Sequence, residues 1–118
     1  MNKNQICHLE IACSDAKQSA AFYEALFGWK INYDMGQDYI LFDPEQGAGG
    51  AFSKEAQVTP SKSVVLYWQV DDIDAMLAKA VKLGGREVTP KTAIPGHGWY
   101  GKFEGPDGHI MGLFTPKE

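Results

Sequence analysis

The chain has 118 residues, of which 44% are apolar and 22% charged, a composition that fits one soluble domain with a single core. Its formal charge is −4 and Lys and Arg do not cluster, which excludes a nucleic-acid-binding face. No apolar run approaches the roughly 20 residues of a membrane helix, and no signal peptide is recognisable. We therefore expect a cytoplasmic protein with neither nucleic acid nor membrane as a partner.

The first predicted elements are a strand and a helix. Residues 6–13 are predicted to form a strand, because Leu9 and Ile11 alternate with His8 and Glu10 with a period of two. Asp15 and Gln18 resemble a capping box, and Gly28 stands where a C′ glycine ends a helix. The stripe expected to face the core consists of Ser19, Phe22, Tyr23 and Leu26.

Three further strands and a linker follow this helix. Residues 29–33 and 39–42 predict a hairpin, and residues 49–53 predict a fourth strand weakened by glycine. Residues 54–62 contain Pro60 and show little periodicity, so we interpret them as a linker.

The same order of elements then restarts. Residues 64–70 predict a strand, and Asp71 or Asp72 is expected to cap a second helix. The apolar stripe of this helix is Ile73, Met76, Leu77 and Ala80. The remaining predicted elements are a short strand at 86–89, a Pro- and Gly-rich loop at 90–98, and a hairpin of residues 99–104 and 109–114.

Constant shifts in residue number relate the two halves. A shift of 57 takes Asp15 to Asp72, and a shift of 62 takes Gly50 to Gly112. This pattern indicates an internal duplication of a βαβββ unit. We predict an α+β fold in which two such repeats form an open curved sheet or barrel, with the helices outside. The single domain spans 1–118, with repeats at 5–53 and 63–115 joined by the linker 54–62.

The segments that carry the duplication resemble a known superfamily. Residues 8–15 (HLEIACSD), 21–29 (AFYEALFGW), 70–74 (VDDID) and 105–114 (GPDGHIMGLF) are similar to the vicinal oxygen chelate superfamily of glyoxalase-like proteins. The resemblance implies the fold described above, a small-molecule ligand and a homodimer. Because this superfamily includes glyoxalases, extradiol dioxygenases and bleomycin-binding proteins, the fold alone does not define a reaction.

The resemblance also implies four metal-ligand positions, on the first and last strand of each repeat. They fall on His8, Val65, Gly50 and Gly112. Only His8 offers a ligating side chain, whereas a catalytic metal takes about three protein ligands. We therefore expect a lost metal site and no cofactor. The alternative is a divalent metal held by His8, with Glu10 and His97 as ligands outside the family pattern.

Strand alternation predicts the residues of a binding site. His8 and Glu10 share one face of their strand, and the shift of 57 makes Tyr67 the partner of Glu10. We expect His8 and Glu10 to carry any catalysis, with a pKa of His8 raised if the two pair as ions. The residues expected to bind the ligand are Tyr67, Gln69, His97, Trp99, Gly50 and Gly112. The alternative for the aromatic ones is that they only close the core.

Two classes of function remain open at this point. We interpret the chain as a small-molecule-binding glyoxalase-like protein that has lost the family metal site. The alternative is an enzyme of the lyase, isomerase or dioxygenase type that uses His8 as a metal ligand or as an acid or base. A protein-interaction module has no specific support in the sequence.

Overall fold

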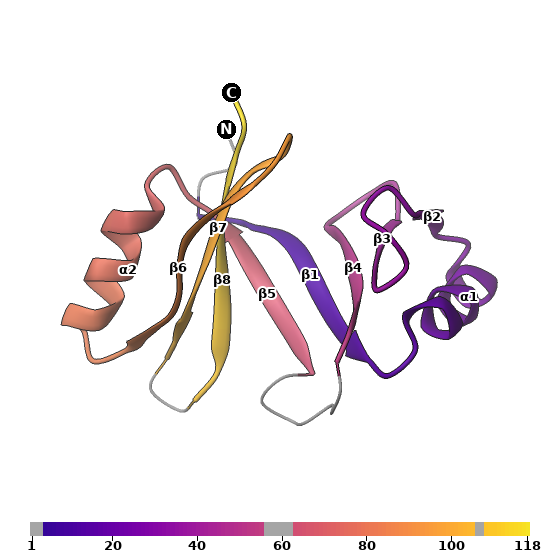
Figure 1. Ribbon diagram of the computed structural model, residues 1–118, viewed down its shortest axis with the longest axis horizontal. Helices are drawn as coiled ribbons and strands as arrows, with labels where there is room; N and C mark the ends of the chain where they lie inside the picture. Colours follow the sequence, from indigo (N-terminus) through magenta and orange to yellow (C-terminus); the bar gives the residue numbers. More distant parts are fainter. Residues whose placement is uncertain (1–3, 56–62, 106–107) are drawn as a thin grey trace. The chain divides into compact units, whose positions relative to one another are not determined.

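The computed structural model describes residues 4–55, 63–105 and 108–118. Its elements follow the order strand, helix and three strands, and this order occurs twice (Figure 1). The first set is β1 (Ile6–Cys13), α1 (Ala16–Phe27), β2 (Lys30–Asn32), β3 (Tyr39–Asp43) and β4 (Gly49–Lys54). The second set is β5 (Val64–Gln69), α2 (Ile73–Lys82), β6 (Arg86–Ile94), β7 (Gly98–Glu104) and β8 (Ile110–Pro116). The predicted α+β fold of two βαβββ repeats is confirmed.

The contacts divide the chain into two compact units. One is His8–Val65, and the other combines Met1–Cys7 with Leu66–Glu118. The strands of the first unit lie in the order β2-β3-β4-β1, and those of the second lie in the order β5-β8-β7-β6. In each unit the first and last strand of the repeat pair in parallel, and the other pairs are antiparallel. The predicted linker, residues 54–62, falls mostly outside the described residues.

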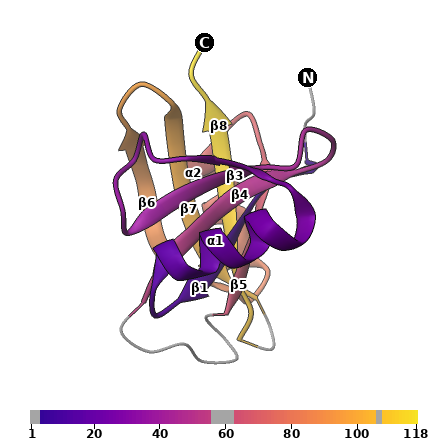
Figure 2. The same ribbon diagram turned by 90° about the vertical axis from the view of Figure 1, so that its right-hand side faces the viewer.

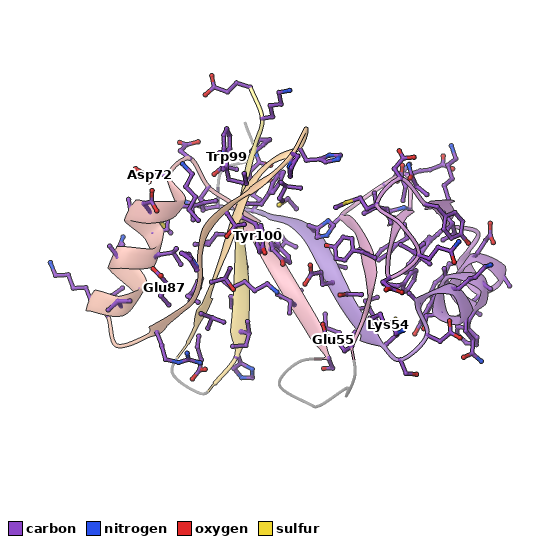
Figure 3. All side chains as sticks on the ribbon, in the orientation of Figure 1. Lys54, Glu55, Asp72, Glu87, Trp99 and Tyr100 are labelled. Carbon is purple, nitrogen blue, oxygen red and sulfur yellow. The ribbon has the colours of Figure 1, made fainter. Side chains whose placement is uncertain are left out.

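Both helices begin at an aspartate, as predicted. The carboxylate of Asp15 accepts a 3.0 Å hydrogen bond from the backbone N–H of Gln18. Asp72, labelled in Figure 3, does the same for Ala75 at 3.0 Å. Each carboxylate satisfies an N–H group that the first helical turn leaves without a backbone partner. Gly28 ends α1 with a φ of 74°, a left-handed conformation in which glycine carries no steric cost.

The core of the His8–Val65 unit lies between α1 and one face of its strands. Figure 2 shows α1 crossing these strands. The buried members of this core are Cys13, Ala16, Ala20, Ile40, Phe42 and Phe52. The predicted stripe of α1 was wrong in part, because Phe22 and Leu26 are each 58% exposed. The small residues Ala16 and Ala20 face the sheet instead, which lets the helix approach it closely.

The second unit has its own core beneath α2. Its buried members are Val70, Ile73, Leu77 and Leu113, with Trp68, Met76, Trp99 and Phe103 packed against them. Ile73 and Leu77 come from the predicted stripe. Figure 1 shows α2 lying beside β6.

The predicted loop at 90–98 is a strand over most of its length. β6 continues through Pro90 to Ile94 and pairs with β7. Proline is tolerated here because β6 is an edge strand, the last in the order of its unit. The pairing with β7 is also irregular around Pro90, with register shifts between Glu87 and Thr89 and between Thr89 and Thr92. No helix in the described ranges has the length and hydropathy needed to cross a bilayer.

Candidate functional site

His8 and Glu10 lie on the face of β1 that points away from α1. Leu9 and Ile11, which alternate with them along the strand, pack against the core beneath α1. In the parallel pairing with β4, His8 lies opposite Gly49 and Glu10 lies opposite Ala51. Both polar side chains therefore stand beside small residues, and both are only partly exposed to solvent.

Tyr39 joins these two side chains into one hydrogen-bonded chain. Its hydroxyl donates a 2.7 Å hydrogen bond to Glu10 Oε2, and it lies 2.9 Å from His8 Nε2. Tyr39 is on β3, and β4 lies between β3 and β1. The phenol therefore reaches across two strand spacings of about 4.8 Å each. It can do so because Gly49 and Ala51 leave this face of β4 almost bare.

The protons of this chain follow from its geometry. Tyr39 uses its single hydroxyl hydrogen in the bond that it donates to the Glu10 carboxylate. In the hydrogen bond with His8, the Tyr39 oxygen is therefore the acceptor and His8 Nε2 carries the hydrogen. Burial lowers the pKa of His8 below its ordinary value of 6.5, and the negative charge of Glu10 opposes this shift without overcoming it. The rise of the His8 pKa that was expected if the two residues paired as ions is therefore not found, because desolvation of the ring outweighs the effect of the Glu10 charge.

In the second unit, the ring of Tyr67 fills the place of a missing side chain. Tyr67 on β5 lies opposite Gly112 on β8, and a Cβ at position 112 would overlap the Tyr67 ring. Tyr67 is 4% exposed. Gly112 thus leaves room for the large side chain of its neighbour. Gln69 follows on the same face of β5 and is half-buried.

The strand registers correct the shift that relates the two closing strands. Glu10 and Tyr67 occupy the same position in the two repeats, 57 residues apart. Glu10 pairs with Ala51 on β4, and Tyr67 pairs with Gly112 on β8. Ala51 is therefore the repeat partner of Gly112, and the shift is 61 rather than 62. Gly50 instead packs so closely against β1 that a Cβ there would overlap the carbonyl oxygen of Leu9. The ligand position implied for Gly50 belongs to Ala51.

The residues at the four implied metal positions do not fit a metal ion. With the corrected register these positions hold His8, Val65, Ala51 and Gly112. Three of them have no side-chain lone pair, and a single imidazole makes a weak site. Within residues 4–55, 63–105 and 108–118, no three His, Cys, Asp or Glu side chains lie together so as to hold a metal.

Two other predicted ligand residues lie on β7 or beside it. Trp99, labelled in Figure 3, packs against the core beneath α2. The Lys91 ammonium lies 5.2 Å from the centre of its ring. Trp99 therefore faces the core, and by strand alternation Tyr100 faces the other side of β7. His97 is exposed in the turn between β6 and β7, where its backbone N–H donates to Ile94.

Sequence reasoning missed Tyr39 as a member of the site. A usable signal existed, because Tyr39 alternates with the buried Ile40 and therefore faces away from the helix, as His8 does. Its reach to β1 depends on the order of the strands, which the sequence pattern did not supply.

Comparisons with known proteins agree with this architecture. The model of the Glyoxalase/Bleomycin resistance protein/Dioxygenase superfamily matches residues 5–112. The protein CFP32 of Mycobacterium tuberculosis, whose name includes the word glyoxylase, is 32% identical over 100 residues. The match covers 81% of this chain but 38% of CFP32, so the chain spans well under half the length of that relative.

Solved structures share the fold at low sequence identity. A superfamily member from Vibrio splendidus has a TM-score of 0.71 at 14% identity, covering 96% of this chain and 99% of that one. Methylmalonyl-CoA epimerase from Mycobacterium tuberculosis has a TM-score of 0.68 at 19% identity, with coverages of 96% and 88%. The Mn(II)-bound glyoxalase from Novosphingobium aromaticivorans has a TM-score of 0.67 at 18% identity, with coverages of 97% and 39%. With two βαβββ repeats and a family model matched over nearly its whole length, the chain belongs to the Glyoxalase/Bleomycin resistance protein/Dioxygenase superfamily.

Proposed function

We propose that this chain is a glyoxalase-like protein that binds a small molecule without the metal ion used by metal-dependent members of its superfamily. The observation that carries this proposal is the hydrogen-bonded chain His8–Tyr39–Glu10. It places three partly buried polar groups together on the sheet face opposite α1. Convergent polar groups on an otherwise apolar surface are typical of sites that orient a small ligand.

The chemistry of these groups suggests what the ligand offers. The Glu10 carboxylate accepts hydrogen bonds, and the neutral ring of His8, which donates through Nε2 to Tyr39, offers an acceptor at Nδ1. A ligand with a hydroxyl or amide group beside an apolar body would satisfy both. In the second unit, Tyr67 and Gln69 remain the proposed ligand contacts, because they occupy the repeat positions of Glu10 and of Ala12. A homodimeric, cytoplasmic protein remains our prediction.

Two measurements test metal-free binding. Isothermal titration with Zn²⁺, Ni²⁺ and Mn²⁺ should give no stoichiometric binding to the wild-type chain, because only one implied ligand position carries a donor. A thermal-shift screen of small hydroxyl- and amide-bearing compounds should find stabilising ligands, and His8→Ala and Glu10→Gln should each lose that stabilisation. Tight stoichiometric metal binding that His8→Ala abolishes would disprove the proposal.

The same hydrogen-bonded chain favours an acid–base enzyme as the second candidate. A lowered pKa keeps His8 neutral near pH 7, as a general base requires. Tyr39 links this ring to the Glu10 carboxylate, so the imidazolium formed on proton uptake would be stabilised. Exchange of carbon-bound hydrogen in D₂O, followed by NMR on ligands found in the screen, distinguishes the two functions. Exchange that is lost in His8→Ala indicates an enzyme.

A further inference from the structure

The hydrogen-bonded chain His8–Tyr39–Glu10 has a single direction. The Glu10 carboxylate carries no hydrogen, so its 2.7 Å contact with Tyr39 is a hydrogen bond only when the phenol donates. Tyr39 has then used its one hydrogen, and its oxygen accepts from His8 Nε2 at 2.9 Å. The hydrogens of Tyr39 and of the neutral His8 ring therefore both point along the chain toward Glu10.

The rings of His8 and Tyr39 are arranged for a hydrogen bond in the plane of the imidazole. Their planes differ by 18°, and their centroids are 6.3 Å apart although His8 Nε2 and the Tyr39 oxygen are 2.9 Å apart. The two rings therefore meet end to end rather than face to face. Because the hydrogen on Nε2 lies in the ring plane, it points at the phenol oxygen in this arrangement.

The surroundings of His8 keep its ring neutral. Burial lowers the pKa of His8 below 6.5, so the ring has a single N–H at neutral pH. Opposite His8 and Glu10, the strand β4 carries Gly49 and Ala51, whose side chains add no hydrogen-bonding group on this face. The polarity of this part of the face therefore depends on the three members of the hydrogen-bonded chain.

The second repeat keeps the phenol of the hydrogen-bonded chain and replaces both of its neighbours. The equivalent positions hold, in the same order, Val65, Tyr100 and Tyr67. Tyr100 is labelled in Figure 3. The βαβββ unit therefore forms without an imidazole or a carboxylate at these positions, and the fold does not explain why the first repeat carries Glu10.

We propose that Glu10, acting through Tyr39, makes this site select ligands that donate hydrogen bonds, an inference that rests on the proposed small-molecule function. The hydrogens of His8 and Tyr39 are both used within the hydrogen-bonded chain, so the lone pairs that its three members present to a ligand are acceptors. A hydroxyl or ammonium group satisfies such lone pairs. A ketone or carboxylate oxygen brings lone pairs of its own and leaves the acceptors unsatisfied. Glu10 is thus the residue that determines specificity, and Tyr39 is a positioning residue.

Nitrogen-15 NMR of the full chain, labelled at histidine, tests the direction of the hydrogen-bonded chain. In the wild type at about pH 8, His8 should be neutral and carry its hydrogen on Nε2. In Glu10→Gln, the amide can either donate to Tyr39 or accept from it, so both directions become possible. The share of His8 with its hydrogen on Nδ1 should rise at least about threefold, because the charge-assisted bond that favoured one direction is gone.

Two further variants separate the effect of Tyr39 from that of charge alone. In a Tyr39→Phe background, Glu10→Gln should leave the His8 tautomer unchanged, because the hydroxyl that transmits the effect is absent. Glu45→Gln removes a carboxylate of the same unit that lies 3.6 Å from Lys30. This control should leave the tautomer as it is in the wild type.

Two neutral fragments of similar size test the selection of ligands. Benzyl alcohol donates a hydrogen bond, whereas acetophenone only accepts one. Titrations at millimolar concentration, followed by the ring protons of His8, should show that the wild type binds benzyl alcohol at least about tenfold more tightly than acetophenone. Glu10→Gln should reduce this ratio at least about threefold, because its amide also offers a donor.

The outcomes distinguish this proposal from the proposed function. A wild type with its His8 hydrogen on Nδ1, a tautomer that Glu10→Gln leaves unchanged, or tighter binding of acetophenone by the wild type would overturn the proposal. If Glu10→Gln does not fold, the wild-type tautomer and the wild-type preference between the fragments decide. Binding of neither fragment would count against the proposed function, while the tautomers would still decide whether Glu10 sets the direction of the hydrogen-bonded chain.

Discussion

Tyr39 donates a 2.7 Å hydrogen bond to Glu10 from a strand that is not the neighbour of β1. The two residues are 29 positions apart in the sequence, and the bond passes over Ala51 on the intervening strand. This side-chain contact links β3 to β1 on the face away from the helix, although no backbone hydrogen bonds join these two strands. It also sets the direction of the hydrogen bond that reaches His8.

Removing the Tyr39 hydroxyl should destabilise the fold, and it removes the hydrogen bond between Tyr39 and His8 Nε2. In Tyr39→Phe, Glu10 and His8 lose their shared partner while partly buried, so the free energy of unfolding should fall by about 1–3 kcal/mol. Urea denaturation measures this change. Tyr33→Phe is the matched control, because Tyr33 is 49% exposed and its change should stay within about 0.5 kcal/mol. Identical losses in the two variants would show that the hydrogen-bonded chain contributes nothing.

The lowered pKa of His8 predicts how stability depends on pH. The unfolded chain takes up a proton near pH 6.5, whereas the folded chain resists protonation to lower pH because the ring is buried. The contribution of His8 is therefore fully present above the unfolded pKa and is lost as pH falls through the folded pKa. Each unit of lowering corresponds to about 1.4 kcal/mol.

The measurement compares the wild type with His8→Gln, whose amide keeps a donor beside Tyr39. Unfolding free energies between about pH 8 and pH 5 should fall more steeply for the wild type than for the variant. Parallel curves would mean that the pKa of His8 is not lowered by folding, and a steeper variant would mean that it is raised.

The overlap between position 112 and Tyr67 predicts a strong coupling. Gly112→Ala should cost about 1–3 kcal/mol, because the new methyl group overlaps the buried ring. In a Tyr67→Ala background the same substitution should cost much less, since the ring is absent. Thermal or urea unfolding of the four proteins of this cycle gives the coupling. Gly105→Ala is the control, because the nearest atom to its Cβ would be 3.9 Å away. Equal costs in both backgrounds would contradict the packing.

The two capping aspartates should contribute similarly to stability. Asp15→Ala and Asp72→Ala each remove a 3.0 Å hydrogen bond to a backbone N–H of the first turn, so each should cost about 1 kcal/mol. Asp34→Ala serves as a control in a loop, where the Asp34 contact uses only its backbone N–H. Stability that is unchanged in either cap variant, measured by urea unfolding, would count against the cap.

Local sequence signals determined the order and the ends of most elements. Strand alternation predicted β1, and aspartate and glycine marked the limits of α1, because these signals act between residues a few positions apart. The duplication was readable for the same reason, since equal local signals recur 57 residues apart. Local signals misjudged β6, because whether Pro90 breaks a strand depends on the place of that strand in the sheet.

Tertiary structure decided which residues meet. The sequence placed His8 and Glu10 on one face, but only the position of β4 between β1 and β3 brings Tyr39 to both. Strand pairing likewise decided that Ala51, rather than Gly50, is the partner of Gly112. A helical period showed that α1 is amphipathic, but which flank it buries depended on how closely Ala16 and Ala20 let it approach the sheet. Such contacts depend on pairing and packing between distant segments, which no local pattern of residues encodes.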